Sequence, residues 1–122
     1  MKPEDELLEE FADRGVQRGT SVYYDAATSA AIFRECAKRS IVVLGVEGLL
    51  LKEGYIYPNL AAIMDGSMSR YDGDWEGLVR VCYQGALKLI EEYASIPGYV
   101  FDLDLISKET WEEDHAEHGS AH

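Results

Sequence analysis

Glu47 is the acidic side chain in the body of the chain whose neighbours best suit chemistry. It follows an apolar run at residues 41–44 and lies between Gly45 and Gly48. Ligands of open α/β sheets bind beyond the carboxyl ends of strands, and glycines let a ligand or a backbone segment approach closely. The pattern predicts either a ligand pocket at Glu47 or a glycine bulge from which Glu47 points into water.

Asp102 and Asp104 alternate with apolar residues in the segment 99–106. This alternation predicts a strand that carries both aspartates on one face. If either aspartate lies beside Glu47, the two carboxylates could act as general acid and general base. A small carboxylate-based enzyme, or a domain that binds a small ligand at Glu47, is therefore one of two functions that the sequence supports.

The residues of several common active sites and metal sites are missing from the body of the chain. The three histidines, His115, His118 and His122, all follow residue 107, so Ser-His and Cys-His catalysis has no base before that point. Cys36 and Cys82 are too far apart in sequence for a zinc motif. Because a glycine-rich phosphate loop is also absent, we expect no metal and no cofactor.

The charge of the chain is strongly negative and is concentrated in two segments. Lys and Arg number 11 against 23 Asp and Glu, which gives a net charge of −12. Residues 1–13 hold one cation and six acids, and residues 107–122 hold one cation and five acids. This balance argues against nucleic acid and anionic lipid as partners. The acidic segments either keep the protein soluble or steer a basic partner.

Tyrosine is the second signal that favours a protein partner. Six of the eight tyrosines fall in predicted strands or loops: Tyr23, Tyr24, Tyr55, Tyr57, Tyr71 and Tyr99. Tyrosine is frequent at interfaces because one end of its ring is apolar and the other polar, although half-buried positions on a sheet would explain the same pattern. We expect a contact face made of Tyr55, Tyr57, Tyr71, Asp72, Asp74, Asp102 and Asp104.

Apolar periodicity and capping residues predict the elements that position these side chains. Helices are expected over 4–14, 26–39 and 75–94, with Asp25 and Asp74 as N-caps. Strands are expected over 20–24, 41–44 and 99–106, with a hairpin over 49–57. Pro58 ends that hairpin and opens a short helix over 59–64, and a loop follows over 65–73.

These elements predict a small two-layer α/β or α+β domain over residues 1–106, followed by an acidic, histidine-containing tail over 107–122. Its mixed sheet has about four strands, with the helices 26–39 and 75–94 on one face and parallel crossovers between strands. The expected core centres on Phe33, Val42, Leu44, Leu78, Cys82 and Phe101. Buried, unpaired thiols, the lack of a leader and the lack of a membrane span lead us to expect a cytoplasmic protein.

The order of a loop at residues 71–73, a helix and a last strand resembles that of the barstar-type immunity proteins over about a third of the chain. The acidic charge and the tyrosines point to a non-catalytic protein that binds a basic partner. The first function that we expect is therefore an acidic protein-binding module, such as an immunity protein or inhibitor of a basic toxin or enzyme. The ligand-binding or enzymatic domain around Glu47 is the alternative.

Overall fold

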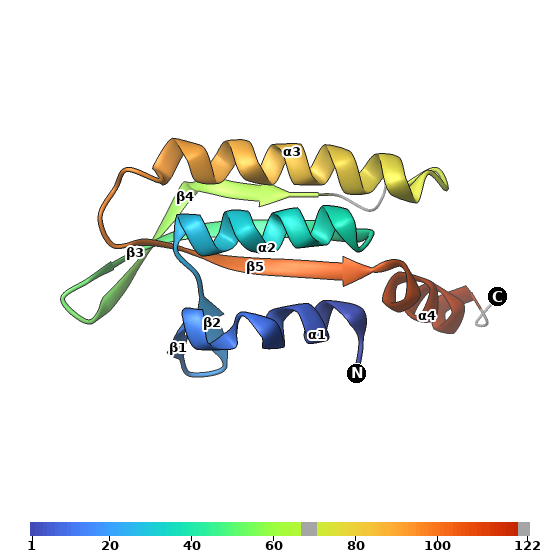
Figure 1. Cartoon of the computed structure of the whole chain (residues 1–122), viewed down its shortest axis with the longest axis horizontal. Helices are drawn as coiled ribbons and strands as arrows, with labels where there is room; N and C mark the ends of the chain where they lie inside the picture. Colours follow the sequence, from blue (N-terminus) through green and yellow to red (C-terminus); the bar gives the residue numbers. More distant parts are fainter. Residues whose placement is uncertain (67–70, 120–122) are drawn as a thin grey trace.

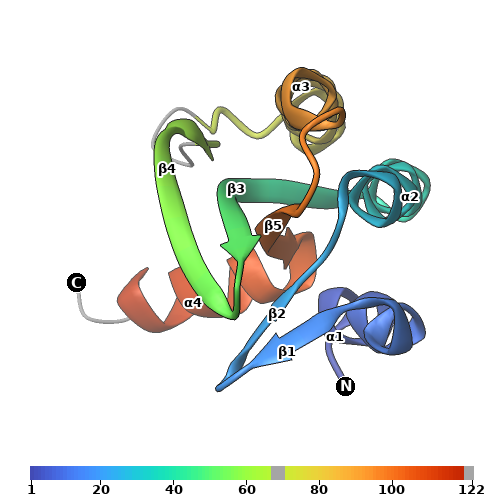
Figure 2. The same cartoon turned by 90° about the vertical axis from the view of Figure 1, so that its left-hand side faces the viewer.

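The computed structural model describes residues 1–66 and 71–119, and confirms a small α+β domain. Two helices, α2 (Ala26–Lys38) and α3 (Trp75–Tyr93), lie on one side of a three-stranded sheet (Figure 1, Figure 2). The strands are β3 (Ile41–Lys52), β4 (Tyr55–Asp65) and β5 (Tyr99–Ser107), in the order β4-β3-β5. The two predicted main helices are confirmed to within one residue at their ends.

Four further elements, besides one 3-10 turn, complete the described fold. They are α1 (Pro3–Glu10), the hairpin strands β1 (Val16–Arg18) and β2 (Ser21–Tyr23), and α4 (Lys108–Gly119). A single 3-10 turn at Ala12–Arg14 joins α1 to the hairpin. Within the described residues no helix is both long and apolar enough to cross a membrane.

Local chemistry explains where α2 and α3 begin. The Asp25 carboxylate accepts the backbone N–H of Thr28 at 2.8 Å, and the Asp74 carboxylate accepts that of Gly77 at 3.0 Å. Each N-cap satisfies an amide that the first helical turn leaves without a partner. The two predicted caps are therefore confirmed.

Every pair of neighbouring strands in the described sheets is antiparallel, unlike the predicted mixed sheet. The strands joined by helices do run parallel to each other, but a third strand separates them. Thus β4 and β5 both pair antiparallel with β3, and α3 crosses over β3 to connect them. In the same way, Tyr24 at the end of β2 bridges antiparallel to Phe101 of β5, which separates β2 from β3.

β4 is the element that the sequence predicted least well. It continues through Pro58, and the segment expected as a helix over 59–64 is strand instead. Proline is tolerated there because β4 is an edge strand, where one row of N–H groups has no ladder partner. The register with β3 shifts so that Gly48 alone faces residues 59–62 of β4. A Cβ at Gly48 would lie 2.7 Å from both the Ala62 Cβ and the Tyr99 ring, so glycine is required.

The main core lies between the sheet and the helices, and its largest fully buried side chains include Phe33, Phe101, Leu7 and Ile32. Of the six predicted core residues, Phe33, Val42, Cys82 and Phe101 are buried. Leu44 and Leu78 are only half-buried. Leu44 leaves the core because it is the extra residue where β3 shifts register against β5, between Val43 and Gly45. Both thiols are buried and unpaired, as predicted.

Candidate functional site

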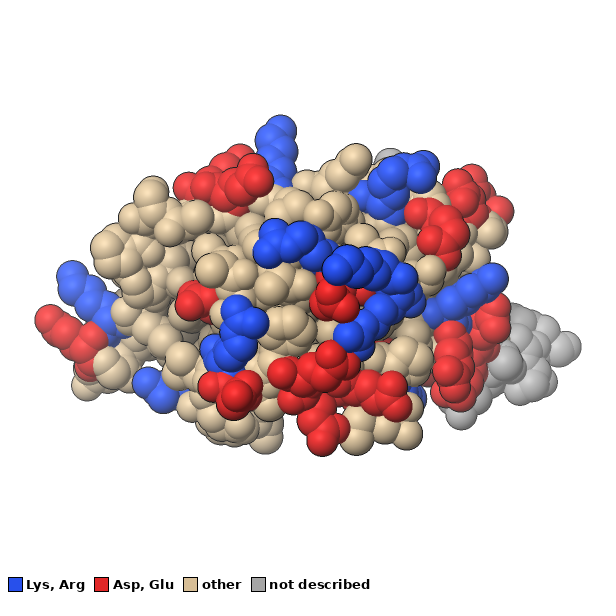
Figure 3. Space-filling view, viewed as in Figure 1, with Lys and Arg blue, Asp and Glu red and all other residues tan. Residues whose placement is uncertain are grey.

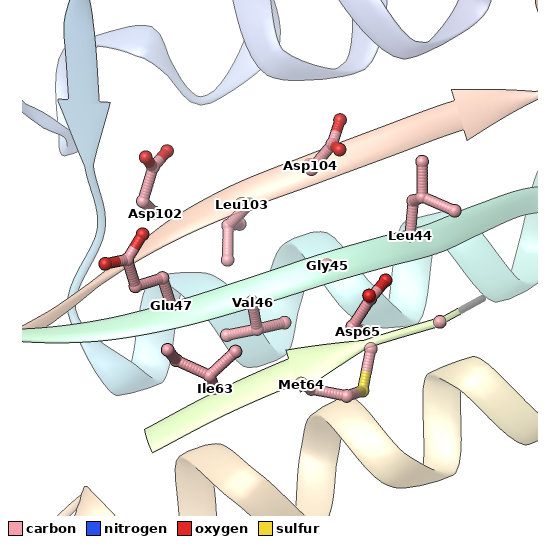
Figure 4. A pocket seen from close by; sticks show the side chains of 11 residues that line it. Leu44, Gly45, Val46, Glu47, Ile63, Met64, Asp65, Asp102, Leu103 and Asp104 are labelled. Carbon is pink, nitrogen blue, oxygen red and sulfur yellow. The ribbon is translucent and has the colours of Figure 1, made fainter. Parts of the chain in front are cut away.

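The face of the sheet that α2 and α3 leave uncovered forms an open pocket of about 580 Å³. Its lining comes from three neighbouring stretches, residues 44–47 of β3, 63–66 at the end of β4, and 102–104 of β5. Figure 4 shows four carboxylates around it, those of Glu47, Asp65, Asp102 and Asp104. The sequence singled out three of these four acids.

Strand register brings the carboxylates together in two rows across the sheet. In the first row, Glu47 of β3 is the partner of Asp102 on one side and of Ile63 on the other. In the second row, Gly45 is the partner of Asp104 and Asp65. The Cα atoms of directly opposed residues in antiparallel strands lie about 4.5–5.5 Å apart. Glu47 and Asp102 are therefore neighbours across the sheet, an arrangement that the sequence left open.

The electrostatic environment of Asp102 and Asp104 disfavours the ionisation of these two carboxyl groups. Burial, followed by the charges of Glu47 and Asp104, raises the pKa of the half-buried Asp102. Burial and then the charge of Asp65 raise the pKa of Asp104. No lysine or arginine is among the described residues that line the pocket. A cation that approached this face would relieve repulsion between carboxylates that are already partly desolvated.

The helical side of the molecule is different, because cations and acids alternate there (Figure 3). Arg39 holds the Glu10 carboxylate through two hydrogen bonds of 2.6 and 2.8 Å and also contacts Glu35, which in turn pairs with Lys38. These ion pairs neutralise much of the local charge. The pocket on the sheet face differs, because its described lining residues include four acids and no lysine or arginine.

The shape of the pocket bears on what it could do. It is larger than the roughly 300 Å³ of the smaller ligand sites, but it is an open hollow on the sheet surface, and Ile63 beside it is 47% exposed. Acid–base catalysis benefits from a site that excludes water. In the described part of the chain no three metal-ligating side chains form a group that could hold a metal ion.

The other predicted contact residues lie elsewhere. Tyr55 and Tyr57 are exposed at the end of the β3–β4 hairpin, 68% and 49% respectively. Tyr71, Asp72 and Asp74 lie at the start of α3, at the opposite end of the molecule (Figure 1). The seven predicted residues thus occupy three separate regions, and only Asp102 and Asp104 line the sheet-face pocket.

Local contacts explain the residues at the start of α3. The Tyr71 ring meets Trp75 and Trp111 edge-on, with centroids 5.6 and 4.7 Å apart. Asp74 is the helix cap, and the Asp72 carboxylate accepts the Asp74 N–H at 3.1 Å. Each of these side chains therefore has a structural partner.

Sequence reasoning missed Asp65 and Ile63, because the stretch that contains them was assigned to a helix and a loop. The stretch Ile63-Met64-Asp65 has no alternation of apolar and polar residues that would identify a strand. His115 is exposed, and its ring stacks on Trp111 at 3.8 Å. The His118 side chain and His122 lie outside the described part of the chain.

No protein-family model and no curated protein matches this sequence.

Proposed function

We propose that this protein is a non-catalytic module whose acidic sheet face binds a basic surface of another protein. By the acidic sheet face we mean Glu47, Asp65, Asp102 and Asp104 together with Leu44 and Ile63. The observation that carries the proposal is the arrangement of four carboxylates, from three adjacent strands, around one open hollow.

Charge and desolvation both favour a cationic partner. An arginine or lysine placed over the Glu47–Asp102 pair would interact with two carboxylates at once, and arginine can do so through parallel hydrogen bonds. Asp102 is already half-buried, so binding removes less water from it than from a fully exposed acid. Electrostatic complementarity of this kind raises the association rate and suppresses wrong partners.

Two apolar side chains complete the surface. Ile63 is 47% exposed beside Glu47, and Leu44 is half-buried at the other side of the hollow. A partner with aliphatic or aromatic groups between its cations would cover them. An inhibitor or immunity protein of a basic toxin or enzyme, acting in the cytoplasm, is the concrete form of this function that we propose.

One observation favours the alternative of a small-ligand or catalytic site. Glu47 and Asp102 are adjacent, and the pKa of Asp102 is raised. Such a pair could share a proton with a cationic or amine-bearing ligand. The open shape of the hollow makes this the second candidate.

Affinity capture with the purified protein, followed by purification of what is retained, tests the proposal. The variant Glu47→Gln/Asp102→Asn removes two charges from the acidic sheet face. The control Glu91→Gln/Glu92→Gln removes two exposed charges from the end of α3. We expect a basic protein that binds the wild type and the control equally, and binds the sheet-face variant at least about tenfold more weakly. Equal binding of both variants, or retention of acidic proteins only, would refute the proposal.

A further inference from the structure

The outer edge of β5 is occupied at both of its ends by groups from the N-terminal part of the chain. Near its start, Tyr24 and Phe101 exchange two backbone hydrogen bonds of 3.0 and 2.8 Å. Six residues later, the Ser107 N–H donates to the Glu4 carboxylate at 3.0 Å. Residues two apart in a strand direct their backbone N–H and C=O groups toward the same edge. The backbone groups of Leu103 and Leu105 therefore lie between these two points, on the same edge.

Helix α1 packs against this part of the strand. Its Leu7 is fully buried, and Leu8 is partly buried in the cluster that also contains Leu103 and Leu105. At the other end of α1, Glu10 is bound by Arg39 of α2 through two hydrogen bonds. A helix over an edge strand is one of the ways in which proteins prevent that edge from pairing with another chain.

Glu4 also reaches the beginning of α4. Ser107 is the residue before this helix, and its hydroxyl accepts the Thr110 N–H at 3.2 Å and lies 3.0 Å from the Thr110 hydroxyl. The Glu4 side chain is buried against this capping group, with 6% of the residue exposed. A carboxylate is stabilised near the N-terminus of a helix, where backbone N–H groups lack partners.

The second carboxylate oxygen of Glu4, Oε1, is buried and has no hydrogen-bond partner among the described residues. Burying an oxygen in this way costs free energy. The contact is therefore held by the packing of α1 and by the hydrogen bond from the Ser107 N–H to Oε2. We therefore expect Glu4 to separate from Ser107 and from the beginning of α4 in a single opening step.

We propose that α1 is a removable cover for the outer edge of β5, and that Glu4 couples this cover to the docking of α4. Opening at Glu4 would release the edge amides of Leu105 and Ser107 together with the cap of α4. Helices α1 and α4 would then open together, and this opening would also break the contact of Glu10 with Arg39 of α2.

Hydrogen–deuterium exchange of the full chain, read amide by amide, tests this coupling. The variant Glu4→Ala is compared with Glu6→Ala, which removes the same charge from an exposed position of the same helix. Amides of Val43 and Val46 in β3 report global unfolding. We expect Glu4→Ala to accelerate exchange at Leu105, Ser107 and Thr110 by about tenfold or more beyond the change at β3, as local opening would. Glu6→Ala should not do so.

A second variant tests the coupling from the other side. Ser107→Ala removes the hydroxyl that caps α4 but leaves α1 unchanged in sequence. We expect it to accelerate exchange at Leu7 and Leu8 beyond the change at β3. The proposal is overturned if either variant changes exchange equally throughout the sheet, or if Ser107→Ala leaves the α1 amides as protected as in the wild type.

Discussion

Glu47 and Asp102 are register partners on adjacent antiparallel strands, and both belong to a sheet face that α2 and α3 leave uncovered. Like charges directly opposed in a sheet are destabilising. Repulsion between Glu47 and Asp102, with Asp104 and Asp65 in the next row, therefore lowers the stability of the fold. A cation bound at this face would reduce that repulsion.

Charges on the acidic sheet face should control how long a partner stays bound. We expect Asp102→Asn to raise the dissociation rate, because a cation of the bound partner would lose the carboxylate that it faces within the interface. Replacing the exposed acids Glu112 and Glu113 with glutamine should mainly slow association, since distant surface charges act by steering. Surface plasmon resonance at two salt concentrations measures both rates. The assignment fails if Asp102→Asn leaves dissociation unchanged and the α4 variant accelerates it.

Stability should rise as the sheet-face aspartates become protonated. Burial and neighbouring acids raise the pKa values of Asp102 and Asp104. A carboxyl with a raised folded-state pKa stabilises fully below its unfolded pKa, and this contribution is lost as pH rises through the folded value. Between pH 7 and about pH 4, the wild type should therefore gain more stability on acidification than Asp102→Asn/Asp104→Asn.

Glu4 should act in the opposite direction at lower pH. Burial opposes its ionisation, but hydrogen bonds, first from the Ser107 backbone, outweigh burial and lower its pKa. Its contribution is present above the unfolded pKa and is lost as pH falls through the folded value. Urea unfolding at several pH values measures both effects, with Asp13→Asn/Asp114→Asn as an exposed control. Identical pH dependence of stability in Asp102→Asn/Asp104→Asn and in the wild type would contradict the prediction for the two sheet-face aspartates.

Gly48→Ala should destabilise the protein by about 1–3 kcal/mol, as overpacking does. Its new Cβ would meet the Ala62 Cβ and the Tyr99 ring at 2.7 Å. Gly45→Ala is the matched control in the same strand, where the nearest atom would lie at an ordinary 3.5 Å. Chemical denaturation compares the two. A smaller loss for Gly48→Ala than for Gly45→Ala would mean that β4 does not pack on β3 as described.

Neither thiol should react readily in the folded protein. Burial raises the pKa of Cys36 to about 12 and also raises the pKa of Cys82. The thiolate is the reactive form, so a thiol reagent should label both residues only after unfolding. Mass spectrometry after brief labelling at pH 7.5 measures this. Rapid modification of Cys36 in the absence of urea would place α2 outside the core.

The parts of the fold that depend on short stretches of sequence could be predicted. The helices α2 and α3 follow from a cap and an apolar face within each segment, and both thiols were expected inside because they lie on those faces. Strand β4 could not be predicted in the same way. Pro58 and the detour over residues 59–62 are tolerated only because β4 is at the edge of the sheet and Gly48 lies opposite.

The candidate site could be predicted in part. Glu47, Asp102 and Asp104 were each identified from their own strand, but only the register of β3 with β5 makes Glu47 and Asp102 neighbours. That register depends on an extra residue at Leu44, which no local pattern marks. The role of Tyr71 as a contact residue stays a prediction. Its setting in a loop suggested an interface, and its half-buried ring packs edge-on against Trp75 and Trp111.

The two irregularities of β3 have a consequence for how the sheet assembles. A regular strand can slip by two residues against its neighbour and still keep its apolar side chains on the same face. Here the shift at Leu44 against β5 and the shift at Gly48 against β4 each fit one alignment only. A misaligned β4 or β5 would place an unmatched residue against a regular ladder, which disfavours that alignment. The two irregularities thereby hold the acidic rows in one register.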